Sequence, residues 1–443
     1  MKLYIETLGC LKNSNDSEGI GGIWERSGQT VTDDPWEADV ILVNTCAFIN
    51  DAKTESINTI FDMTRLARER EDSGLSKPLL IVAGCLGQRY GSELVDEIPE
   101  VDVFMGVNDY EKLPEIVAER KKLYCSGTPE QFVEFTSRKL ESNPYAATLR
   151  IAEGCNNCCA YCVIPQIRGG YRSRPMDSII EEAEVLAKAG TKELILIAQD
   201  VTEYGRDIYG ELRLPMLLRR LCRVEGIRWI RLMYCYEDKI TEELIRTMAE
   251  EEKICNYIDI PLQHISDSVL KAMRRRSTES SIRNTIDALR RAIPDIHIRT
   301  TFITGFPGET EEDFEKLAAF AEETEFERLG VFAYSREEGT PAGDMECQID
   351  EDTKAERADS IMRCQVDISR RNNMKKIGEV FEVIVDGMDE EGAYLGRTVY
   401  DAPEIDNTVI FSGDDDRVYK PGDMVKVRIT DAFDYDLTGT VCG

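Results

Sequence analysis

The sequence predicts an α/β protein with three parts: an N-terminal doubly wound parallel sheet, a central (β/α) barrel, and a small all-β barrel of the oligonucleotide-binding type at the C-terminus. Strand-like and helix-like runs alternate through the first 120 or so residues and again from residue 148, and this alternation indicates parallel sheets. The last 70 or so residues instead contain short strands separated by turn residues. That pattern is typical of a small closed barrel.

The N-terminal part contains four strand-like runs, at residues 3–8, 38–43, 78–83 and 101–105. Cys10, Cys46 and Cys85 follow the first three of these runs. Ligands collect at the carboxyl ends of the strands of an open α/β sheet, so we expect these cysteines to converge and to form a ligand site. Gly9 and Gly84 would permit the tight turns that this requires. Three buried cysteines that merely close strands are the open alternative.

Residues 126–146 are polar and rich in turn signals, which predicts a connector.

The central part has strand-like runs at 148–152, 194–197, 227–233, 257–260, 296–302 and 329–333, with amphipathic helices such as 176–188 and 282–292 between them. About six βα units in series predict a partial or complete barrel, with its active site at the carboxyl ends of the strands. Two such ends, at residues 198–200 and 304–309, look functional, and ordinary strand-to-helix turns are the alternative. Thr310 and Asp313 then indicate a capping box at the start of a helix.

A charged helix at residues 351–374 precedes five short strands, at 380–385, 393–398, 408–411, 424–430 and 438–441. The predicted domains are therefore residues 1–125, the connector 126–146, the central domain 147–375 and the C-terminal barrel 376–443.

Three cysteines, Cys155, Cys159 and Cys162, lie on one short loop directly after the first strand of the central part. Three thiolates suit a four-iron cluster, because one iron then lacks a protein ligand and can bind a small molecule. A structural zinc site is the alternative, but zinc normally requires four closed ligands. The chain has only two histidines, and neither is near this loop in the sequence. A fourth ligand could come from Cys158, although its neighbour Cys159 would then have to bind the same ion.

Composition narrows the possible functions. The 443 residues carry a formal net charge of −30, which argues against generic nucleic-acid binding and favours a basic partner, despite local basic runs at 168–174 and 274–276. The chain has 14 cysteines, and in a large chain without a secretion signal these favour metal or redox chemistry over disulfides. We find no stretch long enough to cross a bilayer and no leader peptide, so we expect a cytoplasmic protein without membrane contact.

The Cys-x3-Cys-x2-Cys loop, with Tyr161 before its last cysteine, resembles the cluster loop of the radical S-adenosylmethionine (SAM) enzymes. In that superfamily the open iron of a 4Fe–4S cluster binds SAM, and an electron cleaves SAM to a 5′-deoxyadenosyl radical. The resemblance implies that Tyr161, Gln199 and Gly305 contact SAM. No catalytic residue is implied beyond the cluster ligands.

Across essentially its whole length the chain resembles the methylthiotransferase family. The resemblance implies that Cys10, Cys46 and Cys85 hold an auxiliary 4Fe–4S cluster and that the C-terminal barrel is a TRAM substrate-recognition module. Four segments resemble the RimO branch of that family, at residues 9–13, 16–18, 198–200 and 401–406. That branch modifies an aspartate of the twelfth small-subunit ribosomal protein. Radical transfer of a methylthio group to the β-carbon of that aspartate, with two SAM molecules used per turnover, is the expected reaction. Cys158 departs from the family pattern and has no assigned role.

The charge of the C-terminal barrel bears on the substrate. Residues 377–443 contain sixteen acidic and five basic side chains, a net charge of −11. Such a module would attract a basic ribosomal protein and repel phosphates, so we expect Asp401, Glu404 and Asp406 to bind substrate. The alternative is that these acidic side chains only face solvent and bind no substrate. A transfer RNA adenosine methylthiotransferase and a non-catalytic iron–sulfur scaffold remain rival functions. An electron donor such as flavodoxin or ferredoxin is a further expected partner.

Overall fold

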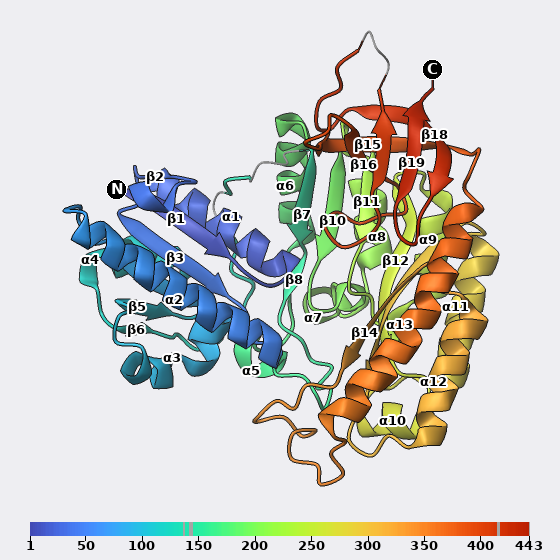
Figure 1. The fold of residues 1–443 in the computed structure, drawn as a ribbon, viewed down its shortest axis with the longest axis horizontal. Helices are drawn as coiled ribbons and strands as arrows, with labels where there is room; N and C mark the ends of the chain where they lie inside the picture. The colour runs from blue at the N-terminus through green and yellow to red at the C-terminus, as the bar shows by residue number, and fades with distance from the viewer. Residues whose placement is uncertain (136–137, 141–144, 414–416, 443) are drawn as a thin grey trace. The chain divides into compact units, whose positions relative to one another are not determined.

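The computed structural model describes residues 1–135, 138–140, 145–413 and 417–442 (Figure 1). The chain forms two compact units, each assembled from separate segments. The first unit comprises Met1–Glu141, Ala152–Arg174 and Ser335–Gly343, and the second comprises Ser142–Ile151, Pro175–Tyr334 and Asp344–Gly443. These units group segments by packing, so the domain boundaries given above stay a prediction. Residues 136–137 and 141–144 of the expected connector lie outside the described residues.

The first unit contains a six-stranded sheet in which all neighbouring strands are parallel. The strand order is β2-β1-β3-β4-β5-β6, and the strands are β1 Lys2–Thr7, β2 Thr30–Val31, β3 Val40–Thr45, β4 Leu79–Gly84, β5 Val103–Met105 and β6 Leu123–Tyr124. The four expected strands correspond to β1, β3, β4 and β5. Strands β2 and β6 have two residues each, too few for a hydrophobic pattern to reveal.

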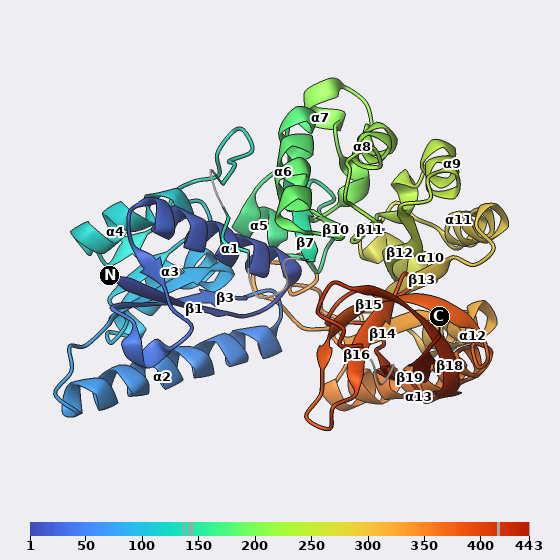
Figure 2. The same ribbon diagram turned by 90° about the horizontal axis from the view of Figure 1, so that it is seen from above.

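Helices cover both faces of this sheet, which confirms the doubly wound arrangement (Figure 2). The helices are α1 Leu11–Arg26, α2 Asn50–Asp72, α3 Cys85–Glu97, α4 Leu113–Glu119 and α5 Ile164–Arg168, with short 3-10 turns at Pro35–Glu37 and Tyr110–Lys112. On one face α1 contributes Trp24 and α4 contributes Ile116. On the other face α2, α3 and α5 contribute Ile60, Leu86 and Ile167. Helix α5 follows the Cys155 loop, so hydrophobic burial holds that loop within the first unit.

The second unit contains another six-stranded parallel sheet, in the order β14-β13-β12-β11-β10-β7. Its strands are β7 Ala146–Arg150, β10 Glu193–Ile197, β11 Trp229–Leu232, β12 Ile254–Gln263, β13 His297–Thr304 and β14 Arg328–Ala333. Consecutive strands are neighbours, as expected for serial βα units, and the sheet corresponds to a partial barrel. The two short strands β8 Ala152–Glu153 and β9 Arg172–Ser173 flank the Cys155 loop in the first unit.

The helices of the second unit are α6 Met176–Ala189, α7 Arg206–Tyr209, α8 Leu214–Leu221, α9 Glu242–Glu250, α10 Asp267–Ala272, α11 Glu279–Ala292, α12 Glu311–Thr324 and α13 Glu351–Met374, with 3-10 turns at Val201–Glu203 and Glu237–Lys239. The expected capping box begins α12. The Thr310 side chain accepts a hydrogen bond from the Asp313 N–H, and the Asp313 carboxylate accepts one from the Thr310 N–H. These bonds satisfy two backbone donors that the first helical turn leaves without partners.

The C-terminal strands form a closed barrel in the order β15-β16-β17-β19-β18. They are β15 Val380–Met388, β16 Tyr394–Thr398, β17 Val409–Ser412, β18 Met424–Ala432 and β19 Leu437–Val441. Val383, Phe411 and Val427 are among the residues that fill its core. The expected small all-β barrel is thus confirmed. Among the described residues, none of the helices combines the length and the apolar character needed to cross a membrane.

Candidate active site

Three neighbouring strands of the first sheet end beside one another, and each is followed by a cysteine. Thr7 of β1 pairs with Asn44 of β3, and Thr45 of β3 pairs with Gly84 of β4. Cys10 precedes α1, Cys46 follows β3, and Cys85 begins α3. The parallel register thus brings these three positions to one edge of the sheet.

Two glycines allow this close approach. A Cβ atom on Gly9, whose φ is +95°, would lie 2.8 Å from Cys46 Cβ and 3.2 Å from its Sγ. A Cβ atom on Gly84, whose φ is +92°, would lie 2.6 Å from the Thr45 carbonyl oxygen. Any larger residue would push the loops apart, so the glycines are part of the site.

The three thiols lie in one electrostatic neighbourhood. Burial by itself would raise the pKa of Cys10. The net pKa is nevertheless lowered, because the effect of burial is outweighed by the charges of Lys12 and Arg168 and by the backbone N–H groups of residues 12 and 13. Burial raises the pKa of Cys46 to about 11, and Cys85 adds to the rise. Burial also raises the pKa of Cys85, against the charge of Arg168. The N-terminus of α1 therefore favours a thiolate at Cys10, whereas burial disfavours the thiolate form of Cys46 and Cys85.

The second trio lies in the loop between β8 and β9, in the same unit. The Cys155 N–H donates to the Gly169 carbonyl at 3.1 Å, and the Cys162 N–H donates to the Cys159 carbonyl at 3.1 Å. Burial raises the pKa of Cys162 strongly, and the nearby Cys159 and Cys155 thiols add to this. The Ile164 N–H points at Cys162 Sγ from 3.4 Å. Cys159 is buried, whereas Cys158 is exposed with a φ of +52°.

Backbone N–H groups around both trios suit the sulfur ligands of iron–sulfur clusters. Such groups are aimed at Cys10 and Cys162. Within the described part of the chain, no three His, Cys, Asp or Glu side chains are placed to hold one metal ion. The assignment of the six cysteines as ligands stays a prediction that this arrangement fits.

Buried polar side chains brace the loops that carry Cys10 and Cys46. The Asn13 amide donates to the Leu8 carbonyl at 2.7 Å and to the Thr45 carbonyl at 3.1 Å. The Asn44 amide donates to the Asn13 carbonyl at 2.9 Å. The sequence analysis noted Asn13 only as part of the segment 9–13. The cross-bracing by the two asparagines depends on contacts about 30 residues apart, which spacing along the chain does not reveal.

The segment Ser335–Gly343 also packs within the first unit. The carboxylate of Glu337, 1% exposed, pairs with Lys53 at 2.8 Å and with Arg89 at 2.9 Å. The Ala342 N–H donates to the Ala160 carbonyl, inside the cysteine loop, at 2.8 Å. This segment therefore ties the Cys155 loop to helices α2 and α3. Sequence analysis missed it because Glu337 lies about 250 residues from its arginine partner.

The three expected SAM contacts fall in different places. Tyr161 lies half-buried in the cysteine loop of the first unit. Gln199 and Gly305 belong to the second unit, where they follow the carboxyl ends of β10 and β13. The Gly305 N–H donates to Glu309 at 2.9 Å, and Glu309 pairs with Arg357 at 2.8 Å. This anchored turn gives Gly305 a fixed backbone, and its contact with SAM stays a prediction.

Two of the three expected substrate-binding acids lie inside the second unit. Asp401 is 1% exposed, accepts a hydrogen bond from Thr398 and forms an ion pair with Arg328. The buried carboxylate of Asp406 accepts a hydrogen bond from the Tyr257 hydroxyl at 2.7 Å. Glu404 alone of the three is exposed. Asp401 and Asp406 thus attach the closed barrel to β14 and β12, a role that the sequence analysis did not foresee. Substrate contact by these acids stays a prediction.

A buried charge cluster makes a second attachment. Glu193, the first residue of β10, pairs with Arg231 of β11 at 2.7 Å and with Arg397 of β16 at 2.8 Å. All three side chains are buried. Strand β16 of the closed barrel and strands β10 and β11 of the parallel sheet therefore share a network of paired charges, as buried ions require.

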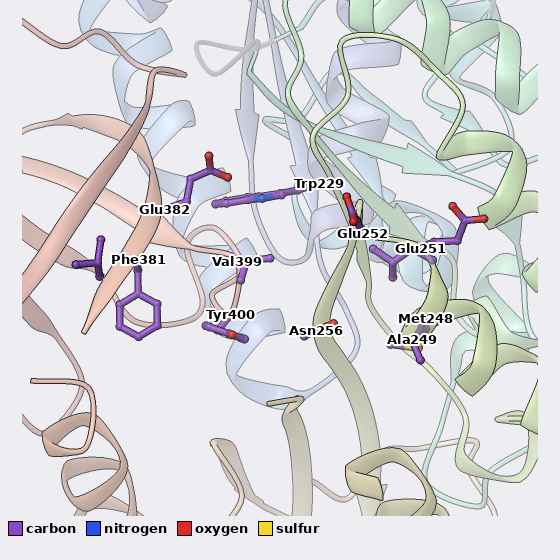
Figure 3. Close-up of a pocket in the computed structure, with 12 residues that line it drawn as sticks. Trp229, Met248, Ala249, Glu251, Glu252, Asn256, Phe381, Glu382, Val399 and Tyr400 are labelled. Atoms are coloured by element: carbon purple, nitrogen blue, oxygen red, sulfur yellow. The ribbon is translucent and has the colours of Figure 1, made fainter. Parts of the chain in front are cut away.

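A cavity of about 470 Å³ lies between the closed barrel and strands β11 and β12 of the second unit (Figure 3). It is lined by Trp229, Met248, Ala249, Glu251, Glu252, Ile254, Asn256, Val380, Phe381, Glu382, Val399 and Tyr400. Trp229 and Ile254 begin β11 and β12, so the cavity is at the amino-terminal ends of these strands. Chemistry in barrels of this kind occurs at the carboxyl ends. We therefore do not assign the reaction to this cavity.

Comparison with known proteins decides the family. Residues 149–321 match the Radical SAM superfamily, residues 2–106 match the uncharacterized protein family UPF0004, and residues 377–442 match the TRAM domain. The chain is 48% identical to the ribosomal protein uS12 methylthiotransferase RimO of Geobacter sulfurreducens, over 99% of this chain and 98% of the relative. It is 46% identical to the protein of the same name from Clostridium tetani, over 100% and 98% of the two chains.

The chain belongs to the RimO methylthiotransferase family. This membership makes it a radical SAM enzyme and implies one 4Fe–4S cluster and SAM. Among solved structures, the fold of this RimO-family chain is similar to that of the radical SAM methyltransferase TsrM from Kitasatospora setae, with a TM-score of 0.57 and 15% identity over 77% of this chain and 76% of that one. The cobalamin-dependent SAM radical enzyme OxsB gives 0.55 and 13% identity, over 83% and 56%. These two likenesses concern the fold alone.

Proposed function

We propose that this protein transfers a methylthio group to the β-carbon of an aspartate in ribosomal protein uS12, using a radical SAM reaction. The observation that carries the proposal is the pair of cysteine trios in one compact unit of a chain that is 48% identical to relatives bearing this name. The β-carbon beside a carboxylate has no proton acidic enough for base chemistry near neutral pH, so a radical route is required.

Each trio has its own task in this proposal. Cys155, Cys159 and Cys162 would hold the cluster whose open iron binds SAM, and Cys10, Cys46 and Cys85 would hold an auxiliary cluster. When bound, these clusters supply the electron that cleaves one SAM and the sulfur that accepts a methyl group from another. The protein's own residues bind and orient: burial keeps water from Cys85 and Cys159, and Gly9 and Gly84 let the auxiliary loops meet.

The acidic C-terminal barrel supports a basic protein substrate. Its net charge of −11 would attract a lysine- and arginine-rich ribosomal protein and disfavour phosphates. Glu404 is exposed and available for such an interaction. We further propose that a small electron donor, such as flavodoxin or ferredoxin, reduces the SAM-cleaving cluster.

Product analysis tests the reaction. Anaerobically reconstituted protein is incubated with SAM, a reductant and either uS12 or transfer RNA, and mass spectrometry follows the gain of a methylthio group. We expect modified uS12, unmodified transfer RNA and 5′-deoxyadenosine. Modification of the RNA alone would establish the rival RNA activity, and absence of 5′-deoxyadenosine would favour a non-catalytic scaffold.

Iron content tests the two sites separately. About eight irons per chain are expected from two four-iron clusters. The triple alanine variant at positions 10, 46 and 85 should retain about four irons and still cleave SAM, but make no methylthio product. Product from that variant would contradict the assignment of the auxiliary site.

A further inference from the structure

Arg168 is a buried cation whose single guanidinium reaches the segments that carry both cysteine trios. It is the last residue of α5, six positions after Cys162, and is 2% exposed. One nitrogen, Nη2, lies 2.9 Å from Asp16 and donates to Asn13 Oδ1 at 3.1 Å. The other, Nη1, lies 3.4 Å from both carboxylate oxygens of Glu153.

The same Nη2 also lies 3.7 Å from the Sγ atom of Cys85, with hydrogen-bonding geometry. Asn13 and Asp16 belong to α1, which begins directly after Cys10. Glu153 lies in β8, two residues before Cys155. Because the segments 152–174 and 1–141 pack in one unit, these contacts form within a single compact body.

We propose that Arg168 is a positioning residue that fixes the Cys85 ligand against the SAM-cluster loop and raises the reduction potential of the auxiliary cluster. The inference rests on the function proposed above, because it takes Cys10, Cys46 and Cys85 as cluster ligands. It concerns a residue that our sequence analysis noted only as part of a local basic run.

The physical basis is the charge of the guanidinium. Reduction adds an electron to a cluster, and a nearby positive charge that hydrogen-bonds to a ligand sulfur stabilises the reduced form more than the oxidised form. The reduction potential therefore rises. Burial strengthens this effect, because water is not there to screen the charge.

Geometry makes arginine the suitable residue. Its planar fork can donate to Asn13 and Glu153 and pair with Asp16 while still facing Cys85. A lysine would keep the charge but present one compact donor, so it could not serve both the α1 side chains and Glu153. The two carboxylates compensate the buried charge and hold the fork in position.

Potentiometric titration followed by electron paramagnetic resonance tests this. The full chain carries the C155A/C159A/C162A substitutions, so that only the auxiliary cluster remains, with about four irons. In this background we expect R168Q to shift the cluster to a more negative potential and to change its resonance line shape. R168K should give an intermediate shift, because it preserves the charge without the fork.

R70Q is the matched control. Arg70 is another buried arginine of the first unit, but its guanidinium donates to the Ala38 and Pro35 carbonyls, before the start of β3. R70Q removes a buried charge at the other end of that strand and should leave the potential unchanged.

The possible results separate the inference from the proposed function. A background protein without iron would overturn the assignment of the auxiliary ligands, and with it the proposed function. Suppose that the cluster loads and that R168Q does not change its reduction potential in the C155A/C159A/C162A protein. That result would overturn only the role of Arg168. If R168Q does not load iron, the R168K variant provides the test. A reduction potential in R168K equal to that of the protein with Arg168 would contradict the proposal.

Discussion

Arg328, the first residue of β14, forms a buried ion pair with Asp401 in the loop that follows β16. The pair joins the parallel sheet of the second unit to its closed barrel. Asp401 also accepts a hydrogen bond from Thr398 at 2.6 Å, so its carboxylate is fully engaged inside the protein. A motif expected to meet substrate therefore also holds two parts of one unit together.

Replacing Asp401 by Asn should lower the free energy of unfolding by about 3 kcal/mol, because the buried Arg328 would lose its nearer counter-charge and retain the more distant Asp406 carboxylate, 4.0 Å from its Nε. Urea denaturation followed by circular dichroism measures this loss. E404Q, a change at the exposed acid of the same motif, should cost less than about 0.5 kcal/mol. Equal losses in the two variants would contradict a special role for the ion pair.

Stability should fall in acid through Asp401. Burial would raise the pKa of this carboxyl, but the charges of Arg328 and Lys376 outweigh burial and lower it to about 2. Because the folded pKa lies below the unfolded value of about 3.9, the contribution of about 2 to 3 kcal/mol is complete above the unfolded pKa. It is lost as pH falls through the folded pKa. The stability difference between wild type and D401N should therefore shrink between about pH 5 and about pH 2.

Replacing Gly305 by Ala should weaken both folding and SAM binding. Its φ is +70°, and an added Cβ would lie 2.2 Å from Lys354 Cγ. G210A is the control, since Gly210 has a φ of +78° but no atom within 4 Å of an added Cβ. The control should lose about 1 kcal/mol from backbone strain alone. Thermal unfolding and calorimetric SAM titration measure both effects, and equal SAM affinity in the two variants would exclude Gly305 from the SAM site.

Replacing Cys158 by Ala should leave the iron content and the yield of 5′-deoxyadenosine unchanged, because the Cys158 side chain is exposed whereas that of Cys159 is buried. The comparison variant is C159A, which should lose about four of about eight irons. Iron and sulfide assays decide the matter. Loss of iron from C158A would make Cys158 a ligand.

Reversing the charge at Glu404 should raise the KM for uS12 several-fold with little change in kcat, because an exposed acid contributes to attraction of a basic substrate rather than to chemistry. The effect should diminish as salt is added. E379K provides the comparison, since Glu379 is an exposed acid of the same barrel outside the 401–406 motif. Equal effects of the two changes would mean that net charge alone recruits the substrate.

Much of the fold was predictable because its signals are local. Helix α13 was expected at residues 351–374 and occupies Glu351–Met374, since a long run of helix-forming residues ends in a turn. The three cysteines after β1, β3 and β4 were found by one rule, that parallel strands end at a common edge. The strands β2 and β6 were missed because two residues carry no periodicity.

The order of strands and helices, the spacing of Cys155, Cys159 and Cys162, and the acidic character of the C-terminal barrel follow from the amino acids alone. Each depends on neighbours in the chain or on composition. Tertiary packing decided which partners buried charges find: Arg168 reaches Cys85 across more than 80 residues, and Asp401 meets Arg328 across more than 70. A charge removed from water requires a counter-charge, and only the folded chain determines which one lies within reach.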